Sequence, residues 1–269
     1  MRNAKALFLA GAISILTVTA FIKINDPLSA KSKITSPAKS YARFANYPPA
    51  DNNDPSDFTF AALASNAVVH VEVKIKDDEV DNPISQSQYN IAGSGVIFSS
   101  DGLIITNNHV IKNALSINVT LADKKSYHAS LIGADAANDI AVLKINANNL
   151  PVISFSNSDV IHVGDWVLAI GYPWSLDETI TAGIISAKSS LINHNVASIP
   201  AGNYLQTDAA INLGNSGGAL VNTRGELVGI TAAIASSTGV YIGYGYAIPA
   251  NTVYKVVQNI LLRSGQAGV

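Results

Sequence analysis

Short runs of alternating apolar and polar residues dominate the chain from about residue 58 onward. Alternation with a period of two places every second side chain on the same face, which is typical of half-buried β-strands. Turn-forming Gly, Asn, Asp and Pro residues separate the runs, as in folds built from many short strands. The pattern predicts strands over residues 68–74, 95–98, 103–107, 116–121, 130–135, 140–145, 166–170, 183–189, 204–207, 219–221, 227–233 and 243–248.

These strands suffice for two six-stranded antiparallel Greek-key β-barrels, so the predicted fold class is all-β. We expect the first barrel over about residues 58–150 and the second over about 151–249. Residues 251–263 follow a helical period instead. Their apolar positions share one helix face, and we expect this face to pack on the second barrel rather than bind a partner. The positions are Val253, Val256, Val257, Ile260 and Leu261.

The first 23 residues predict an apolar helix. Arg2 and Lys5 precede 17 uncharged positions at residues 6–22, and Lys23 follows. Such a helix is about 25 Å long, at the short end of a transmembrane span. One interpretation is a signal anchor with a cytoplasmic N-terminus; the other is a signal peptide cleaved after Ala20. The anchor is favoured by the length of the apolar stretch, and both interpretations place the folded domain outside the cytoplasmic membrane.

Residues 24–57 show neither the two-residue period of a strand nor the period of a helix. They are rich in Pro, Ser, Ala, Asn and Asp, which predicts a flexible linker. Tyr41, Phe44 and Tyr47 interrupt this composition. Either these aromatic residues are incidental, or they form a docking segment.

Composition narrows the class of function. A chain of 269 residues is long enough for a tail and a two-barrel unit. Only 13% of the residues are charged and the formal net charge is −2, which gives no support to a nucleic-acid partner. The chain has no Cys, which excludes disulfides and thiolate chemistry. We see no cluster with metal-ligand spacing, and we expect no cofactor or metal.

The candidate chemistry begins at residues 212–218, Asn-Leu-Gly-Asn-Ser-Gly-Gly. A serine between small residues suits a nucleophile in a tight turn, and the N–H groups of such a turn can stabilise a developing oxyanion. An ordinary turn is the alternative, because the same residue types tolerate unusual backbone angles. Ser216 would also need a base, and that base would need a third group to orient it.

His109 and Asp139 are the candidates for those two roles. His109 lies where a strand ends after an Asp-Gly hairpin turn, and Asp139 immediately precedes the apolar strand at residues 140–145. Side chains at strand ends can project into a cleft. A turn or capping Asp is the alternative for Asp139.

Several runs in this order carry a family resemblance. They are Gly-Ser-Gly-Val-Ile at 93–97, Ile-Ile-Thr-Asn-Asn-His-Val-Ile at 104–111, Asp-Ile-Ala-Val-Leu-Lys-Ile-Asn at 139–146, Leu-Gln-Thr-Asp-Ala-Ala-Ile-Asn at 205–212, and Leu-Gly-Asn-Ser-Gly-Gly-Ala-Leu-Val-Asn at 213–222. Over about residues 58–263 the chain resembles the HtrA/Deg family of trypsin-like serine proteases, and in particular its membrane-anchored DegS-like branch. His109, Asp139 and Ser216 follow in the chymotrypsin-type order.

The resemblance implies a serine endopeptidase that acts on protein or peptide substrates. His109 would be the base, Asp139 its orienting acid and Ser216 the nucleophile. The oxyanion hole would lie at Gly214, Asn215 and Ser216, with N–H donors from the first and last and Asn215 holding the turn. The substrate pocket would be lined by Ala210, Ile211, Ile230, Ala232 and Ile234. Because none of these is acidic, we expect cleavage after small aliphatic residues.

The resemblance also implies assembly and location. We expect a homotrimer that uses Tyr41, Phe44 and Tyr47, in a single-pass inner-membrane protein with its protease domain in the periplasm. The alternative location is soluble periplasmic after signal cleavage. No PDZ-like sequence follows residue 263, so we expect no PDZ domain. Asn215 carries no charge to pair with a new N-terminus, so control is expected from loops at about 172–179, 188–202 and 232–240.

Two residues depart from the family pattern: Tyr172, where Asn is common, and Leu213 before the glycine of the turn. The alternative function is a catalytically silent chaperone or scaffold with a protease fold. For an active enzyme, either general clearance of damaged proteins or one regulated cut is open. The short segment at about 76–90 favours the regulated cut.

Overall fold

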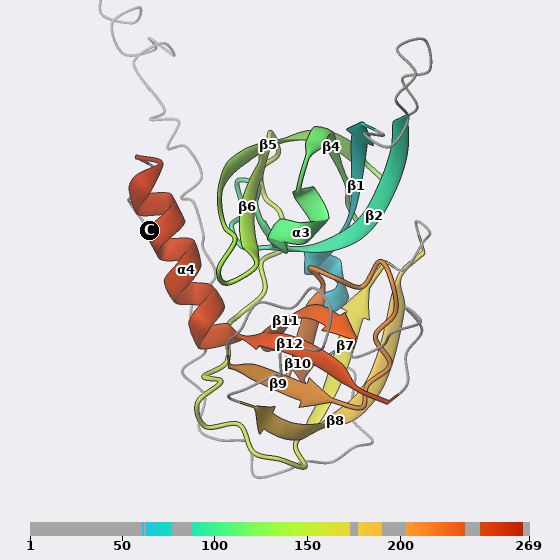
Figure 1. Cartoon of the computed structure of the whole chain (residues 1–269), viewed down its shortest axis with the longest axis vertical. Helices are drawn as coiled ribbons and strands as arrows, with labels where there is room; N and C mark the ends of the chain where they lie inside the picture. The colour runs from blue at the N-terminus through green and yellow to red at the C-terminus, as the bar shows by residue number, and fades with distance from the viewer. Residues whose placement is uncertain are drawn as a thin grey trace, which may run out of the picture. The chain divides into compact units, whose positions relative to one another are not determined.

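The computed structural model describes residues 61, 63–76, 88–172, 177–189, 203–234 and 243–265. Within these ranges twelve β-strands form two closed antiparallel barrels, which confirms the predicted architecture (Figure 1). The predicted apolar helix at 1–23 and linker at 24–57, with Tyr41, Phe44 and Tyr47, lie outside the described residues. None of the helices in the described ranges has the length and apolar character needed to cross a membrane.

The first barrel has the strand order β1-β2-β3-β6-β5-β4 and closes through pairing of β1 with β4. This order is that of a Greek key, because β3 pairs with β6 rather than with β4. Two short helical turns accompany it, η1 (Ala64–Ala67) before β1 and α3 (Asn108–Ile111) after β3. The strands are β1 (Val68–Lys76), β2 (Gln88–Ile97), β3 (Leu103–Thr106), β4 (Ala114–Thr120), β5 (Ser126–Asp135) and β6 (Ile140–Ile145).

The second barrel repeats this plan with the order β10-β11-β12-β9-β8-β7, and it closes through pairing of β10 with β7. Its strands are β7 (Trp166–Gly171), β8 (Thr179–Ser189), β9 (Tyr204–Thr207), β10 (Ala219–Asn222), β11 (Leu227–Ile234) and β12 (Gly245–Pro249). A helix, α4 (Ala250–Arg263), follows the last strand directly.

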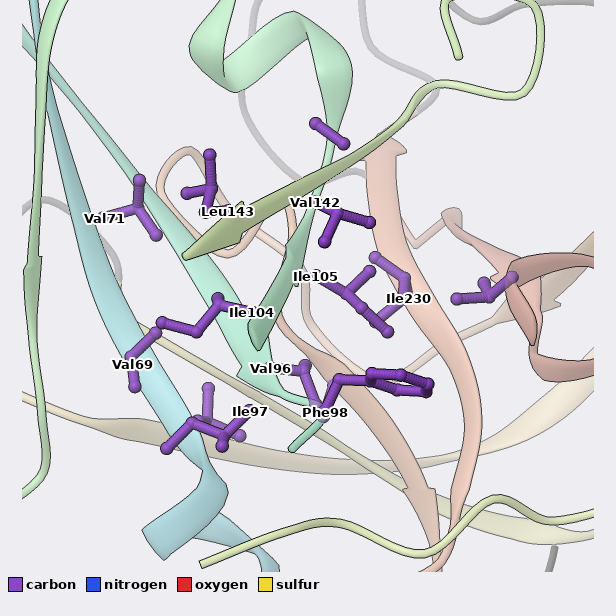
Figure 2. Packing of buried hydrophobic residues seen from close by; sticks show 14 of the residues in the cluster. Val69, Val71, Val96, Ile97, Phe98, Ile104, Ile105, Val142, Leu143 and Ile230 are labelled. Carbon is purple, nitrogen blue, oxygen red and sulfur yellow. The ribbon is translucent and has the colours of Figure 1, made fainter. Parts of the chain in front are cut away.

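Branched aliphatic side chains fill the first barrel and continue into the second. Figure 2 shows side chains from β1, β2, β3 and β6 beside Ile230 of β11, and all of those labelled there are buried. Burial of one such side chain stabilises a fold by about 1.5–3 kcal/mol. With no Cys in the chain, this packing takes the place that disulfides have in many secreted domains.

The C-terminal helix differs in one respect from the prediction. Its predicted apolar face is buried, but α4 contacts β5 and β6 of the first barrel as well as β11 and β12 of the second. Gly133 of β5 makes room for the helix, since a Cβ at that position would lie 2.8 Å from Cγ2 of Ile260. The helical period shows which face is buried, but it does not show which elements bury it.

An aromatic cluster links this helix to the chain between the barrels. Phe155 lies in the crossing segment and is fully buried. Its ring meets those of Phe98 and Tyr254 in edge-to-face pairs, with centroids 6.0 and 5.7 Å apart. A parallel bridge to Leu227 joins the same residue to the second barrel. The cluster therefore ties the end of β2, the crossing segment, α4 and β11 together.

Candidate active site

Asp139 holds the segment that carries His109. Its carboxylate Oδ2 accepts from His109 Nδ1 at 2.7 Å, and Oδ1 accepts from the His109 backbone N–H at 2.9 Å. Its carbonyl oxygen accepts from Asn107 Nδ2 at 2.9 Å and from the Asn108 N–H at 3.2 Å. Through its carboxylate and its carbonyl oxygen, Asp139 therefore holds three consecutive residues, 107–109, before and within α3.

Local backbone geometry explains why the two groups meet. Asp139 has a φ of 54°, in the left-handed region that Asp and Asn tolerate best among residues with a side chain. That kink turns its carboxylate toward α3 just before β6 begins. The carboxylate is largely buried, with 7% of the side chain exposed, whereas the His109 side chain is 42% exposed. The ring is therefore anchored on its inner side and open on its outer side.

This contact also assigns the tautomer of the imidazole. A carboxylate only accepts hydrogen bonds, so Nδ1 of His109 carries a proton, and in the neutral ring Nε2 is then an acceptor. An acceptor at Nε2 is what a general base for a serine hydroxyl requires.

Ser216 follows a tight turn of the second barrel. The Asn215 N–H donates to Asn212 O at 3.0 Å, and Gly214 within this turn has a φ of 95°, as in a type II turn. Thr231 of β11 also holds the turn, because its Oγ1 donates to Asn215 O at 2.6 Å. Asn215 itself is buried.

The three positions predicted for the oxyanion hole do not behave alike. The Asn215 N–H is used within the turn, which fits the expected holding role of that residue. The N–H groups of Gly214 and Ser216 have no acceptor among the residues that the structure describes. Within the described part of the chain, the turn therefore has two backbone donors without an acceptor, one of them on Ser216 itself.

The hydroxyl of Ser216 donates to the carbonyl of Ala232 in β11 at 3.2 Å. Across the described ranges, the structure has no hydrogen bond between this hydroxyl and His109. Sites without substrate commonly lack a tight nucleophile–base contact, which forms when the substrate binds. The candidate nucleophile therefore contacts its own barrel, while the candidate base is held by the other barrel.

Ser94 of β2, in the first barrel, is hydrogen-bonded to the Ser216 segment of the second barrel. Its N–H donates to Ser216 O at 2.8 Å, and its Oγ donates to Gly214 O at 2.7 Å. The same Oγ accepts from the Tyr172 N–H at 2.9 Å. Ser94 is not among the site residues predicted from the sequence, although it lies in the Gly-Ser-Gly run at 93–95, where a polar residue between two glycines was the available signal.

The predicted pocket residues lie in several environments. Ala210 is half-buried, and its carbonyl accepts from Thr181 Oγ1 at 2.7 Å. Ile211 and Ile230 are fully buried and belong to the two hydrophobic clusters of the fold. Ala232 is buried beside Ser216. Ile234 ends β11, and its side chain is outside the described residues.

The two residues that depart from the family pattern are both next to the site. Leu213 is half-exposed in the turn before Gly214. The buried ring of Tyr172 packs edge-to-face on His70 of β1, with centroids 6.1 Å apart. Burial raises the pKa of Tyr172 to about 12 and lowers the pKa of His70. At neutral pH the pair therefore stays uncharged. Of the predicted control loops, the structure describes only the ends.

Comparison with known proteins agrees with this geometry. The family described as "Trypsin-like peptidase domain" matches residues 93–230, which include all three candidate catalytic residues. A "Probable periplasmic serine endoprotease DegP-like" of Chlamydia pneumoniae is 47% identical over 181 residues, covering 67% of this chain and 36% of that protein. The chain belongs to the HtrA/Deg family of trypsin-like peptidases.

Other HtrA/Deg proteins show the same relationship. The "Periplasmic serine endoprotease DegP" of Escherichia coli strain K12 is 44% identical over 192 residues, which cover 68% of this chain and 40% of that protein. The chain thus spans about two fifths of the length of the curated relatives it matches. A solved structure, "HtrA-type protease AlgW with decapeptide", is 38% identical with a TM-score of 0.68, covering 78% of this chain and 68% of that one.

Proposed function

We propose that this HtrA/Deg chain is a serine endopeptidase that works through an acyl-enzyme. The observation that carries the proposal is the pairing of His109 with Asp139 on one barrel and the turn of Ser216 on the other, with two N–H donors that have no acceptor among the described residues. Each part matches a role in acyl transfer: an oriented base, a nucleophile and an oxyanion hole.

In the proposed reaction, Ser216 Oγ attacks the carbonyl carbon of a peptide bond while Nε2 of His109 takes the hydroxyl proton. The N–H groups of Gly214 and Ser216 stabilise the negative oxygen that develops. His109 then gives its proton to the leaving amine, which breaks the C–N bond. Water, deprotonated by His109, releases the acyl group in the same way, and Asp139 stabilises the charged ring in both halves.

For this reaction the hydrogen bond from Ser216 to Ala232 must give way to one with His109. A neutral hydrogen bond contributes only about 0.5–1.5 kcal/mol, so this exchange is small compared with the gain from the oxyanion hole. The resting contact is therefore compatible with an enzyme whose site completes itself around the substrate.

A fluorophosphonate probe tests the proposal, because it forms a covalent bond with an activated serine. We expect labelling of the wild type and none of Ser216→Ala, which also loses peptide hydrolysis. Ser99→Ala, at a buried serine of the first barrel, serves as the control and should be labelled normally. A folded wild type without labelling or hydrolysis would instead favour the alternative, a catalytically silent chaperone or scaffold.

We propose that cleavage follows small aliphatic residues such as Val or Ala. All of the candidate pocket residues are uncharged, namely Ala210, Ile211, Ile230, Ala232 and Ile234. A pocket without a carboxylate gives no partner to Lys or Arg. Hydrolysis of a peptide panel that differs only in the residue before the cut measures this preference. Faster cleavage after Lys or Arg would contradict it.

We further propose a periplasmic enzyme held by the apolar segment at 6–22, with soluble periplasmic protein as the alternative. Relatives that carry the name periplasmic support the compartment. Fractionation of cells distinguishes anchored from released protein. A homotrimer that uses Tyr41, Phe44 and Tyr47 is tested by the mass in solution after deletion of residues 40–50, since an unchanged trimer would refute that role.

We propose that the biological role is a regulated cut in envelope proteins rather than general clearance. The short stretch at about 76–90 supports this choice. Proteomics of a deletion strain provides the test. One stabilised substrate supports regulated cleavage, and many stabilised proteins support clearance.

A further inference from the structure

Ser94 of the first barrel contacts Ser216 through its main chain and the turn that precedes Ser216 through its side chain. It lies in β2 opposite His70 of β1, and none of it is exposed to solvent. Its backbone N–H donates to Ser216 O across the barrel boundary at 2.8 Å. Its own carbonyl accepts from Thr106 Oγ1 at 2.7 Å. The main chain of Ser94 is therefore held on both sides.

The side chain of Ser94 adds two contacts that a single hydroxyl can make at once. Its Oγ donates its single proton to Gly214 O at 2.7 Å and accepts the N–H of Tyr172 at 2.9 Å. A hydroxyl offers one donor and two lone pairs, so both contacts are satisfied together. Alanine at this position would leave the Gly214 carbonyl and the Tyr172 N–H buried without the hydrogen-bond partner that Ser94 provides.

The position of Gly214 explains why this contact matters for chemistry. Glycine has the widest choice of backbone angles, so a turn built on it keeps one shape only where outside contacts fix its peptide groups. In this turn Asn215 is held through both its N–H and its carbonyl, and the Gly214 carbonyl is held by Ser94. The Gly214 N–H, which the proposed reaction uses, is attached to the same residue.

From these contacts we propose that Ser94 is a positioning residue for the oxyanion hole. Its hydroxyl fixes the Gly214 peptide groups so that the Gly214 N–H is ready for the developing oxyanion. This inference rests on the proposed peptidase function. It predicts that Ser94 acts on the rate of the chemical step more than on substrate binding, although it touches no substrate atom.

The test compares Ser94→Ala with Ser99→Ala. Ser99 is a matched control because it is equally buried and its Oγ also accepts one backbone N–H, that of Leu103 at 3.0 Å, while donating to another oxygen, Asp101 Oδ1. These contacts all lie within the first barrel. Loss of either hydroxyl should lower Tm, but only loss of Ser94 should change catalysis.

We expect kcat per fluorophosphonate-labelled site to fall about 10- to 100-fold in Ser94→Ala, since complete loss of one oxyanion donor costs about 100- to 1,000-fold. KM should stay within about threefold, because the interaction acts mainly in the transition state. The affinity of a peptide boronate, which mimics the tetrahedral intermediate, should fall in parallel with kcat/KM. Ser94→Thr, which keeps the hydroxyl, should recover most of the lost rate.

A Ser94→Ala enzyme with a kcat within threefold of wild type and a lowered Tm would show a merely structural role and overturn the proposal. If Ser94→Ala does not fold, Ser94→Cys, with its weaker S–H donor, is judged by the same criterion. Failure of the peptidase proposal has a different signature, because the wild type itself would then neither hydrolyse peptides nor accept the probe.

Discussion

Replacing Asp139 by Asn tests the contact that orients the base, and the structure makes it a clean perturbation. The two side chains have nearly the same shape. The φ of 54° at this position suits Asn at least as well as Asp, so the backbone has no reason to move. Alanine would lack this tolerance and would confuse a catalytic effect with a conformational one.

The expected outcome follows from the two hydrogen bonds of the carboxylate. The His109 backbone N–H can only donate, so the amide oxygen of Asn must face it in place of Oδ1. The amide NH₂ then faces Nδ1 of His109, which must become an acceptor, and the proton moves to Nε2. The opposite amide orientation would set two donors against each other, at a cost of about 1–3 kcal/mol.

With a proton on Nε2, His109 cannot take the proton of Ser216, and the charged ring also loses its partner at 2.7 Å. Loss of this arrangement in a Ser-His-Asp triad lowers kcat by about 10,000-fold. At about 1.36 kcal/mol for each factor of ten, that is about 5 kcal/mol of transition-state stabilisation.

The assay is hydrolysis of a fluorogenic peptide with Val before the cut, with kcat expressed per folded protein. Tm is measured in parallel, and we expect it to change little. A kcat for Asp139→Asn within tenfold of wild type would refute the reasoning, because it would mean that His109 does not depend on this carboxylate for its tautomer.

Two further predictions concern stability. Phe155→Ala should lower the free energy of unfolding, measured by urea titration, by about 3–5 kcal/mol, because a buried ring in two aromatic pairs is lost. The control Val160→Ala, at an exposed position, should change this free energy by less than about 0.5 kcal/mol. Equal effects of the two substitutions would refute the stabilising role of Phe155. Burial lowers the folded-state pKa of His70; Glu72 has a smaller raising effect, and Lys124 has a lowering effect. The neutral ring therefore stabilises the fold at a pH above the ordinary pKa of 6.5, and this contribution is lost as the pH falls below 6.5. His70→Gln should therefore flatten the decline of Tm between about pH 7 and 5, and an unchanged slope would count against a buried neutral His70.

The alternation of apolar residues was enough to find the strands, because a half-buried strand must repeat every two residues. The ends of some strands were less accessible. Strand β2 was predicted from residue 95, yet it begins at Gln88 and pairs with β1 along its whole length. In the early part of β2 the alternation is short, because it covers only residues 88–91 and stops at Ala-Gly-Ser, and pairing with β1 keeps this segment extended.

The candidate catalytic residues could be selected from their residue types, whereas the residues that support them could not. His109, Asp139 and Ser216 stand out because few residue types can serve as base, orienting acid and nucleophile. Asn107, Ser94 and Thr231 are ordinary polar residues in the sequence, and their importance comes from partners 16 to 120 positions away. The short helix α3 was also missed, since a four-residue helix carries no period of its own.

The C-terminal helix has a mechanical consequence for the candidate catalytic residues. Because α4 contacts β5 and β6 on one barrel and β11 and β12 on the other, neither barrel can tilt without sliding along the helix. The pair of His109 and Asp139 moves with the first barrel and Ser216 with the second. A tilt therefore changes the distance that the proton travels from Ser216 to His109 but leaves the imidazole oriented. The helix acts as a brace, and it steadies both this distance and the hydrogen bonds from Ser94 to Gly214 and Ser216, which also cross between the barrels.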